Sequence, residues 1–323
     1  MKAFLAYRHP ESVIPIYLAG RAQEISAFDF LNKGEGFVFH AFDNEKNLFL
    51  DQLNTIEQES FDFFYHPHEH EIISKQAYLE TCSTIIEKIR TSPIQKIVFS
   101  RIQKERYHRN PLAIFKSLNE SYPNSFNYII SIENVGTWVG ATPEQFLKKD
   151  HQKLTTVSLA GTKLDPATPW GTKEIVEQQI VSDFIAEQLK KNQCENTEIN
   201  GPSTINTGVV SHLKTIFNTT IKNSYTGQII KDLHPTPATC GLPKNEALKE
   251  IQHFEQHKRR YYTGFLGLVN SNQLDLFVNL RCMEIDANYA YLYLGGGITC
   301  DSDPALEWHE TLHKAKTLDH FLR

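Results

Sequence analysis

Four charged residues stand at helical positions where the hydrophobic pattern predicts protein interior. Glu177 shares one helical face with the apolar residues three, four, seven and eight positions after it. Glu307, Glu310 and Lys314 recur at positions i, i+3 and i+7 near the C-terminus, so they also share one face. Buried carboxylates need a cation, hydrogen bonds or water to offset their desolvation. We therefore predict a magnesium site shared by two helices, with a salt-bridged acid as the alternative for Glu177.

Two helices must present these residues. Apolar periodicity predicts one helix over residues 172–191. Asp303 and Pro304 form an N-cap followed by proline in the first turn, which begins the other helix. A further helix is predicted over residues 74–89 from the same periodicity.

Strands make up much of the remaining chain. Period-two alternation predicts a strand over residues 96–103, and two hairpins are expected in residues 127–139 and 275–294. In the second hairpin, a strand over residues 275–284 returns through a short turn as a strand over 289–294. Hairpins pair antiparallel, which excludes a doubly wound parallel sheet and predicts an α+β fold.

Composition and charge exclude several classes of partner. The 323 residues carry a net charge of -5 at pH 7, so we expect neither nucleic acid nor an anionic membrane as a partner. The five cysteines are odd in number and include no CxxC pair, which argues against a disulfide framework and a zinc knuckle. The first residues lack the continuous apolar segment of a signal peptide, and we expect a cytoplasmic protein.

Six short motifs follow one another from about residue 94 to the C-terminus. They are KIVFSR (96–101), GATPE (140–144), LAGT (159–162), HPTPA (234–238), GGGI (295–298) and EWHE (307–310). In this order they resemble the signatures of chorismate-utilising enzymes, a family that includes isochorismate, salicylate, anthranilate and aminodeoxychorismate synthases. The resemblance implies the fold of anthranilate synthase component I, with large antiparallel sheets packed with helices. We divide this single domain into a variable N-terminal portion (1–90) and a chorismate-binding catalytic region (91–323).

The members of this family differ in the nucleophile that they add at C2 of chorismate, and Lys96 bears on that choice. Members that use water resemble this chain in carrying lysine at the start of the first motif, where anthranilate synthases usually carry glutamine. The resemblance therefore implies water as the nucleophile and Lys96 as the general base. Ala160 stands where aminodeoxychorismate synthases commonly carry a nucleophilic lysine. The alternative for Lys96 is an edge-strand lysine that discourages aggregation.

The C4 hydroxyl of chorismate leaves more easily when protonated, and the resemblance assigns Glu144 as the general acid. It also implies Glu177 and Glu310 as magnesium ligands, with Glu307 near the metal either directly or through water. The alternative for Glu307 is an acid on the helix surface. His234 is expected beside the substrate, although a histidine before proline can also simply close a turn. The substrate-binding residues implied by the resemblance are Gly161, Thr162, His234, Arg281, Gly295, Gly297 and Lys314.

The resemblance predicts an isochorismate synthase, a magnesium-dependent isomerase that moves hydroxyl from C4 to C2 of chorismate. A salicylate synthase is the closest alternative, and the difference depends on pocket shape around Tyr262, Thr263 and Leu280. A non-catalytic chorismate-binding or metal-binding protein, using the histidines at 66, 68 and 70, is the alternative from another class. We expect a monomer without a glutamine amidotransferase partner. The sequence leaves open whether the product enters menaquinone or siderophore biosynthesis.

Overall fold

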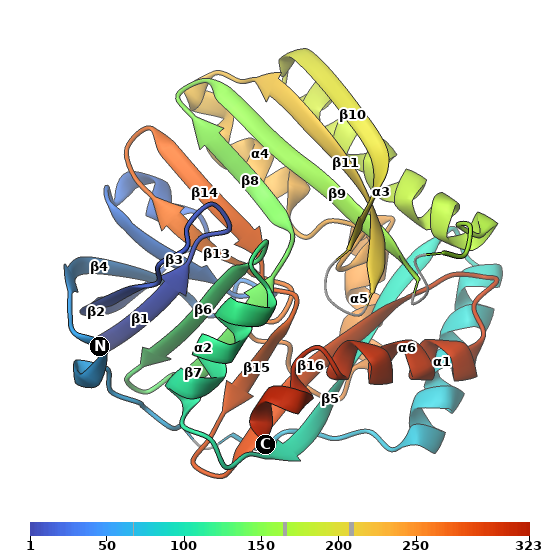
Figure 1. Cartoon of the computed structure of the whole chain (residues 1–323). Coiled ribbons are helices and arrows are strands. Elements are labelled where there is room, and N and C mark those ends of the chain that lie inside the picture. Colours follow the sequence, from blue (N-terminus) through green and yellow to red (C-terminus); the bar gives the residue numbers. More distant parts are fainter. Residues whose placement is uncertain (67, 164–166, 207–209) are drawn as a thin grey trace.

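The computed structural model describes residues 1–66, 68–163, 167–206 and 210–323. These residues form one sheet of 16 strands with helices packed around it, as expected for the predicted α+β class (Figure 1). Every strand pairing among the described residues is antiparallel, as the hairpins in the sequence predicted.

The strands in chain order are β1 (Lys2–Arg8), β2 (Ile16–Ile25), β3 (Gly36–His40), β4 (Asn47–Thr55), β5 (Lys96–Arg106), β6 (Phe126–Ile132), β7 (Gly136–Thr142), β8 (Gln145–Asp150), β9 (Lys153–Lys163), β10 (Glu195–Asn206), β11 (Ser211–Thr220), β12 (Gly241–Leu242), β13 (Phe265–Val269), β14 (Gln273–Val278), β15 (Cys282–Ile285) and β16 (Tyr289–Ile298). The α-helices are α1 (Lys75–Arg90), α2 (Pro111–Ser121), α3 (Thr172–Lys191), α4 (Thr226–Leu233), α5 (Lys244–Phe254) and α6 (Pro304–Ala315). Short 3-10 helices are η1 (Asp29–Asn32), η2 (Gln58–Ser60), η3 (Asn223–Tyr225) and η4 (Asp319–Leu322).

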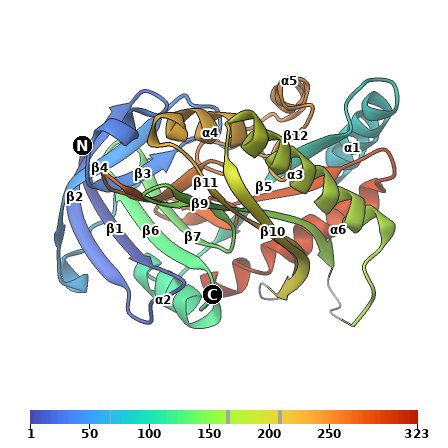
Figure 2. The ribbon, with the colours of Figure 1, turned by 90° about the horizontal axis from the view of Figure 1, so that it is seen from above.

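The sheet curls back on itself. Its strand order is β10-β11-β9-β8-β14-β13-β3-β4-β2-β1-β6-β7-β15-β16-β5-β12, so β9 and β16 stand near opposite ends. Residues of both strands nevertheless line one cavity. Helix α3 packs against β9 and α6 packs against β16 (Figures 1 and 2), and an ion pair between Lys173 and Glu307 links the two helices.

A local signal explains where helix α6 begins. The Asp303 carboxylate accepts a hydrogen bond from the backbone N–H of Leu306 at 2.9 Å, and Pro304 occupies the first turn. The bounds predicted for α3 and the start predicted for α6 are confirmed. Helix α3 buries Val181 and Phe184, which lie on the apolar face that the periodicity predicted.

The predicted continuous strand over residues 275–284 is wrong, because it is broken into β14 and β15. The buried side chain of Asn279 explains the break. It accepts a hydrogen bond from the Tyr128 hydroxyl at 2.7 Å and donates one to the carbonyl of Tyr261 at 3.0 Å. Strand β15 then pairs with β16, as the predicted hairpin requires, and Leu280 and Arg281 reach the cavity from the break.

The N-terminal strands are part of the same sheet as the rest of the chain. Strands β1 to β4 are neighbours in the strand order, and β1 pairs with β6. The division of the chain at residue 90 stays a prediction. The hairpin of β10 and β11 and the helices α4 and α5 lie outside the elements that the sequence analysis identified.

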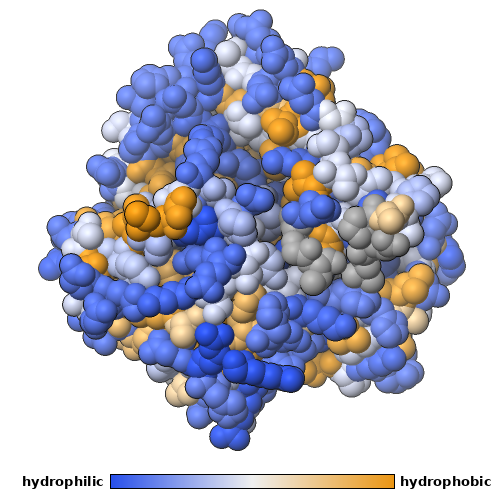
Figure 3. All heavy atoms as spheres, in the orientation of Figure 1, coloured by the Kyte–Doolittle hydropathy of each residue, from blue (hydrophilic) through white to orange (hydrophobic). Residues whose placement is uncertain are grey.

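Figure 3 shows a largely hydrophilic face on which hydrophobic side chains gather in small, separate patches. The most exposed large apolar side chains include Val13 and Ile14, in the turn between β1 and β2. Across the ranges that the structure describes, we find no helix with the length and apolar character needed to cross a membrane.

Candidate active site

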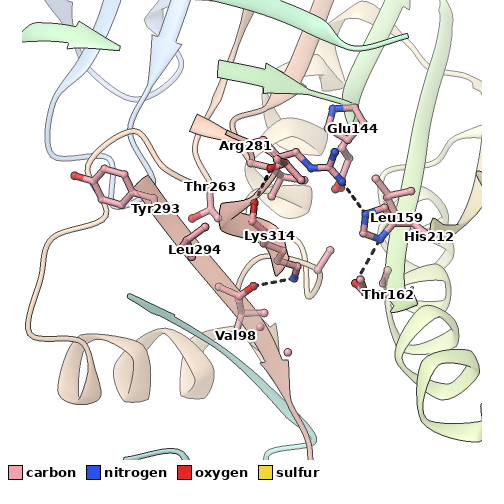
Figure 4. Close-up of a pocket in the computed structure, with 18 of the residues that line it drawn as sticks. Val98, Glu144, Leu159, Thr162, His212, Thr263, Arg281, Tyr293, Leu294 and Lys314 are labelled. Carbon is pink, nitrogen blue, oxygen red and sulfur yellow. Dashed lines mark hydrogen bonds between the residues drawn. The ribbon is translucent and has the colours of Figure 1, made fainter. Parts of the chain in front are cut away.

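A cavity lies where the two ends of the curled sheet face each other. Its walls combine strands β5, β9, β11 and β16 with helices α3 and α6 (Figure 4). Apolar side chains such as Leu159 and Leu294 form part of the wall. The charged and polar side chains that line it include Glu144, Thr162, Glu177, His212, Arg281 and Lys314.

Of the three acids predicted from helical register, Glu177 lines this cavity and Glu307 and Glu310 lie beside Gly296 in its wall; each acid is paired with a lysine. We call Glu177, Glu307 and Glu310 the acid cluster. Its ion pairs are Glu177 Oε1 to Lys96 Nζ at 2.8 Å, Glu307 Oε1 to Lys173 Nζ at 2.6 Å, and Glu310 Oε1 to Lys314 Nζ at 2.7 Å. Each lysine balances the charge of one carboxylate. This pairing offsets the desolvation of three acids that lie close together near the core.

The acid cluster packs against three consecutive glycines of β16, Gly295 to Gly297, which we call the glycine run. A Cβ atom added at Gly296 would lie 3.1 Å from Glu307 Oε2 and 4.0 Å from Glu310 Oε1. One added at Gly297 would lie 2.5 Å from Glu177 Oε1. A side chain at Gly297 would therefore force Glu177 and Lys96 to move, whereas one at Gly296 would only crowd Glu307.

The donor set of the acid cluster fits a hard divalent cation. The buried Oε2 of Glu307 has no hydrogen-bond partner, and burial together with the charge of Glu310 raises the pKa of Glu307. A cation relieves both effects. Within the described ranges no three His, Cys, Asp or Glu side chains form a ready ligand set. Magnesium, however, commonly takes one or two carboxylates and fills its octahedron with water and substrate oxygens, which Glu307 and Glu310 on α6 can support.

Lys96 is fully buried at the first position of β5. Besides its ion pair with Glu177, it lies against the glycine run, because a Cβ at Gly297 would approach Lys96 Cε to 2.7 Å. The ammonium group is thus held beside Glu177 and Gly297, which both line the cavity.

Glu144 follows Pro143 in the connection between β7 and β8, and its side chain is buried at the cavity wall. Burial raises the pKa of Glu144 to about 8, against the opposing charges of Lys96 and Lys214. Its Oε2 has no hydrogen-bond partner. Glu144 can therefore hold a proton at neutral pH and present it to a bound molecule.

His212 on β11 orients Arg281 within the cavity (Figure 4). Its Nδ1 lies 2.9 Å from the carbonyl oxygen of Gly161, so this nitrogen carries the proton and Nε2 accepts from Arg281 Nη2 at 3.2 Å. Burial and the charge of Arg281 lower the pKa of His212 to about 3, which keeps the ring neutral. Arg281 is held in a direction that suits a carboxylate ligand.

The predicted substrate-binding residues converge on this cavity with one exception. Gly161, Thr162, Arg281, Gly295, Gly297 and Lys314 all line it, as do Tyr262, Thr263 and Leu280. Lys314 also donates to the carbonyl oxygen of Gly295 at 2.8 Å. His234 is not among the lining residues. Its ring packs in the core instead, 5.3 Å from the ring of His40 and 5.1 Å from that of Phe265 between centroids.

His212, Gly296 and Lys173 are site residues that the sequence analysis missed. His212 reaches the cavity because β11 pairs with β9 and sets it opposite Thr162. No local pattern marks such a residue, since its position depends on a pairing between distant strands. Lys173 had a detectable signal, because it lies on α3 one turn before Glu177.

The histidine-rich segment before α1 lies against a different residue, Glu284. His68 Nε2 and His70 Nε2 stand 3.7 and 3.6 Å from its carboxylate oxygens. The Arg260 guanidinium already pairs with the same carboxylate. A cation bound there would face this fixed positive charge, which disfavours a metal site at these histidines. Pro67 lies outside the described residues.

Comparisons with known proteins point in one direction. A model of the family described as chorismate binding enzyme matches residues 38–323. The vibriobactin-specific isochorismate synthase of Vibrio cholerae is 28% identical over 263 residues, covering 76% of this chain and 66% of that protein. Isochorismate synthase MenF of Escherichia coli is 24% identical over 262 residues, covering 77% and 61%. The chain thus spans less than two thirds of the length of these relatives.

Solved structures show the same fold. The structure of MenF from Escherichia coli matches with a TM-score of 0.86 at 20% identity, covering 99% of this chain and 89% of that chain. Anthranilate synthase component I from Streptococcus pneumoniae matches with a TM-score of 0.74 at 18% identity, covering 98% and 90%.

Proposed function

Because the chain belongs to the chorismate binding enzyme family, we propose that it is an isochorismate synthase. It converts chorismate reversibly to isochorismate by adding water at C2 and releasing the C4 hydroxyl. One observation carries the proposal: Glu144, whose pKa is raised by burial, lines the same cavity as Glu177, and Glu177 pairs with the fully buried Lys96. The relatives named isochorismate synthase support the same reaction.

In the proposed mechanism, Lys96 takes a proton from the attacking water and Glu144 gives one to the departing hydroxyl. Lys96 can act only as the neutral amine, so its proton must leave before the water attacks. Glu144 is suited to its role because burial keeps it protonated near neutral pH. Thr162 supplies a hydroxyl for the substrate or the water.

The substrate carboxylates find their partners in the same cavity. Arg281, oriented by His212, binds one carboxylate through its fork of N–H donors. Lys314 and the backbone of Gly295 and Gly297 line the site of the same anion. Glu177 and Glu310, with Glu307 directly or through water, would hold magnesium, and the metal would supply positive charge to the ring carboxylate.

The product decides between the candidate functions. Purified protein is incubated with chorismate and magnesium, without an ammonia source, and the products are identified by chromatography and mass. Isochorismate alone supports the proposal. Salicylate with pyruvate would replace it by the salicylate synthase, and a lack of turnover would favour a binding protein. Turnover without ammonia or a second protein also tests the expected independence from an amidotransferase, and the mass in solution tests the expected monomer.

Replacing Gly297 by alanine should lower kcat/KM at least about tenfold, a loss of about 1.4 kcal/mol of transition-state stabilisation. The new methyl group would press on Glu177 Oε1 and on Lys96 Cε at 2.5 and 2.7 Å, which displaces the proposed base and its partner. Gly227→Ala is the matched control, because its Cβ approaches Leu31 Cδ1 at 3.3 Å, away from the site. Equal activity in the two variants would mean that the geometry at Gly297 is not critical.

A further inference from the structure

The three lysines that pair with the acid cluster differ in how firmly their side chains are fixed. The Lys96 side chain is fully buried, and Lys314, with 25% of its side chain exposed, is held by a second bond to the carbonyl of Gly295. Lys173 reaches from the first turn of α3 across to Glu307 on α6, and 31% of its side chain is exposed. Its stem can therefore turn outward into water without disturbing the core.

The ammonium group of Lys173 lies among the carboxylates that would bind a divalent cation. It pairs with Glu307 across the two helices, and the charges of Glu310 and Glu177 act on it as well. All three members of the acid cluster thus act on this one ammonium group. Glu307, its direct partner at 2.6 Å, is also the acid whose second oxygen is buried without a hydrogen-bond partner.

We propose that Lys173 is a tethered competitor of the metal ion. Its ammonium group occupies the acid cluster when metal is absent and leaves Glu307 when a divalent cation binds. This inference rests on the metal site of the proposed function and adds to it a residue that sets metal affinity.

Two consequences follow from this competition. Without Lys173, Glu307 is a buried carboxylate that no lysine neutralises, so the metal-free protein is less stable. Binding of a divalent cation then restores the missing charge without first displacing an ammonium group, so the metal binds more tightly. A lysine that only fixed α3 to α6 would have the opposite effect, because its loss would loosen the two helices that form the site.

The experiment measures Mn2+ binding to wild-type protein and to Lys173→Met at fixed pH, by calorimetry and by the spin-resonance signal of free Mn2+. We expect the dissociation constant of Lys173→Met to fall about tenfold. Thermal unfolding should show a lower Tm for the metal-free variant and a larger rise on adding Mn2+. Lys190→Met, on the exposed face of the same helix, is the matched control and should bind as wild type. Lys173→Arg keeps the charge and should not bind more tightly.

A double-mutant cycle tests whether Lys173 affects metal affinity by neutralising Glu307. In a Glu307→Gln background the charge that Lys173 neutralises is gone, so Lys173→Met should change the Mn2+ affinity little. Equal or weaker binding by folded Lys173→Met overturns the inference while leaving the proposed function intact. If wild-type protein binds no Mn2+, the metal site and this inference fail together, and the product formed from chorismate still decides the reaction.

Discussion

Replacement of Lys96 by alanine should lower kcat for the conversion of chorismate to isochorismate by about 10²- to 10⁴-fold, the range expected for loss of a general base. Substrate binding should change much less, because the proposed carboxylate partners, Arg281 and Lys314, are unaffected. The measurement is kcat and KM from product formation at saturating magnesium. A fall in kcat with little change in KM identifies a group that acts mainly in the transition state.

The same substitution also removes a buried charge, so its effect on folding has to be separated from its effect on catalysis. Lys96 is fully buried beside Glu177, and breaking such a pair costs about 3 to 5 kcal/mol of stability. Lys96→Met fills more of the space than alanine and should give the same loss of kcat with a milder loss of stability. Lys104→Ala, an exposed position on the same strand, is the control. Normal turnover by folded Lys96→Met would remove this lysine from the mechanism.

The helices that carry the acid cluster were predictable because their signals are local. A 3.6-residue period placed Glu177 on the apolar face of α3, and Asp303 with Pro304 marked the start of α6. The register places Lys314 beside Glu310, but it does not give the partner of Glu177. Lys96 comes from a strand far away in sequence, so its pairing with Glu177 depends on how α3 packs over the curled sheet.

His212, which escaped prediction, and the way in which the predicted Arg281 and Leu280 reach the cavity both depend on long-range structure. His212 becomes a cavity residue through the pairing of β11 with β9. Arg281 and Leu280 reach the cavity because Asn279, bonded to Tyr128 and Tyr261, breaks the strand between β14 and β15. Alternation of side chains cannot reveal this break, since the residues on either side continue a strand-like pattern.

His234 lies in the core and not at the lining of the cavity, so its role beside the substrate stays a prediction. The motif HPTPA is intact, yet the ring of His234 packs against His40 in the core. The imidazole that contacts Arg281 is that of His212, which no motif marked. Burial lowers the pKa of both rings, so neither residue type nor protonation state separates the two, and only their position relative to the cavity does.

Activity should fall as the pH rises through about 8, because the proposed general acid Glu144 then loses its proton. Burial raises the folded-state pKa of this group above its ordinary value of 4.5, so the carboxyl group stays protonated across the neutral range.

Glu144→Gln cannot donate a proton and should lower kcat by about 10²- to 10⁴-fold, while Glu120→Gln on the surface serves as control. The pH profiles of kcat for wild type and both variants make the test.

The same pKa shift predicts a change in stability with a definite sign. Between pH 4.5 and about 8, folded Glu144 holds a proton that the unfolded chain releases. Its contribution to the free energy of unfolding is therefore largest at low pH and declines by about 1.4 kcal/mol per pH unit through this window. Glu144→Gln is neutral in both states and should lack this decline, so its stability relative to wild type should rise with pH. Parallel pH dependences of denaturant unfolding in the two proteins would show that Glu144 is ionised in the folded state, and Glu144 could not then be the general acid.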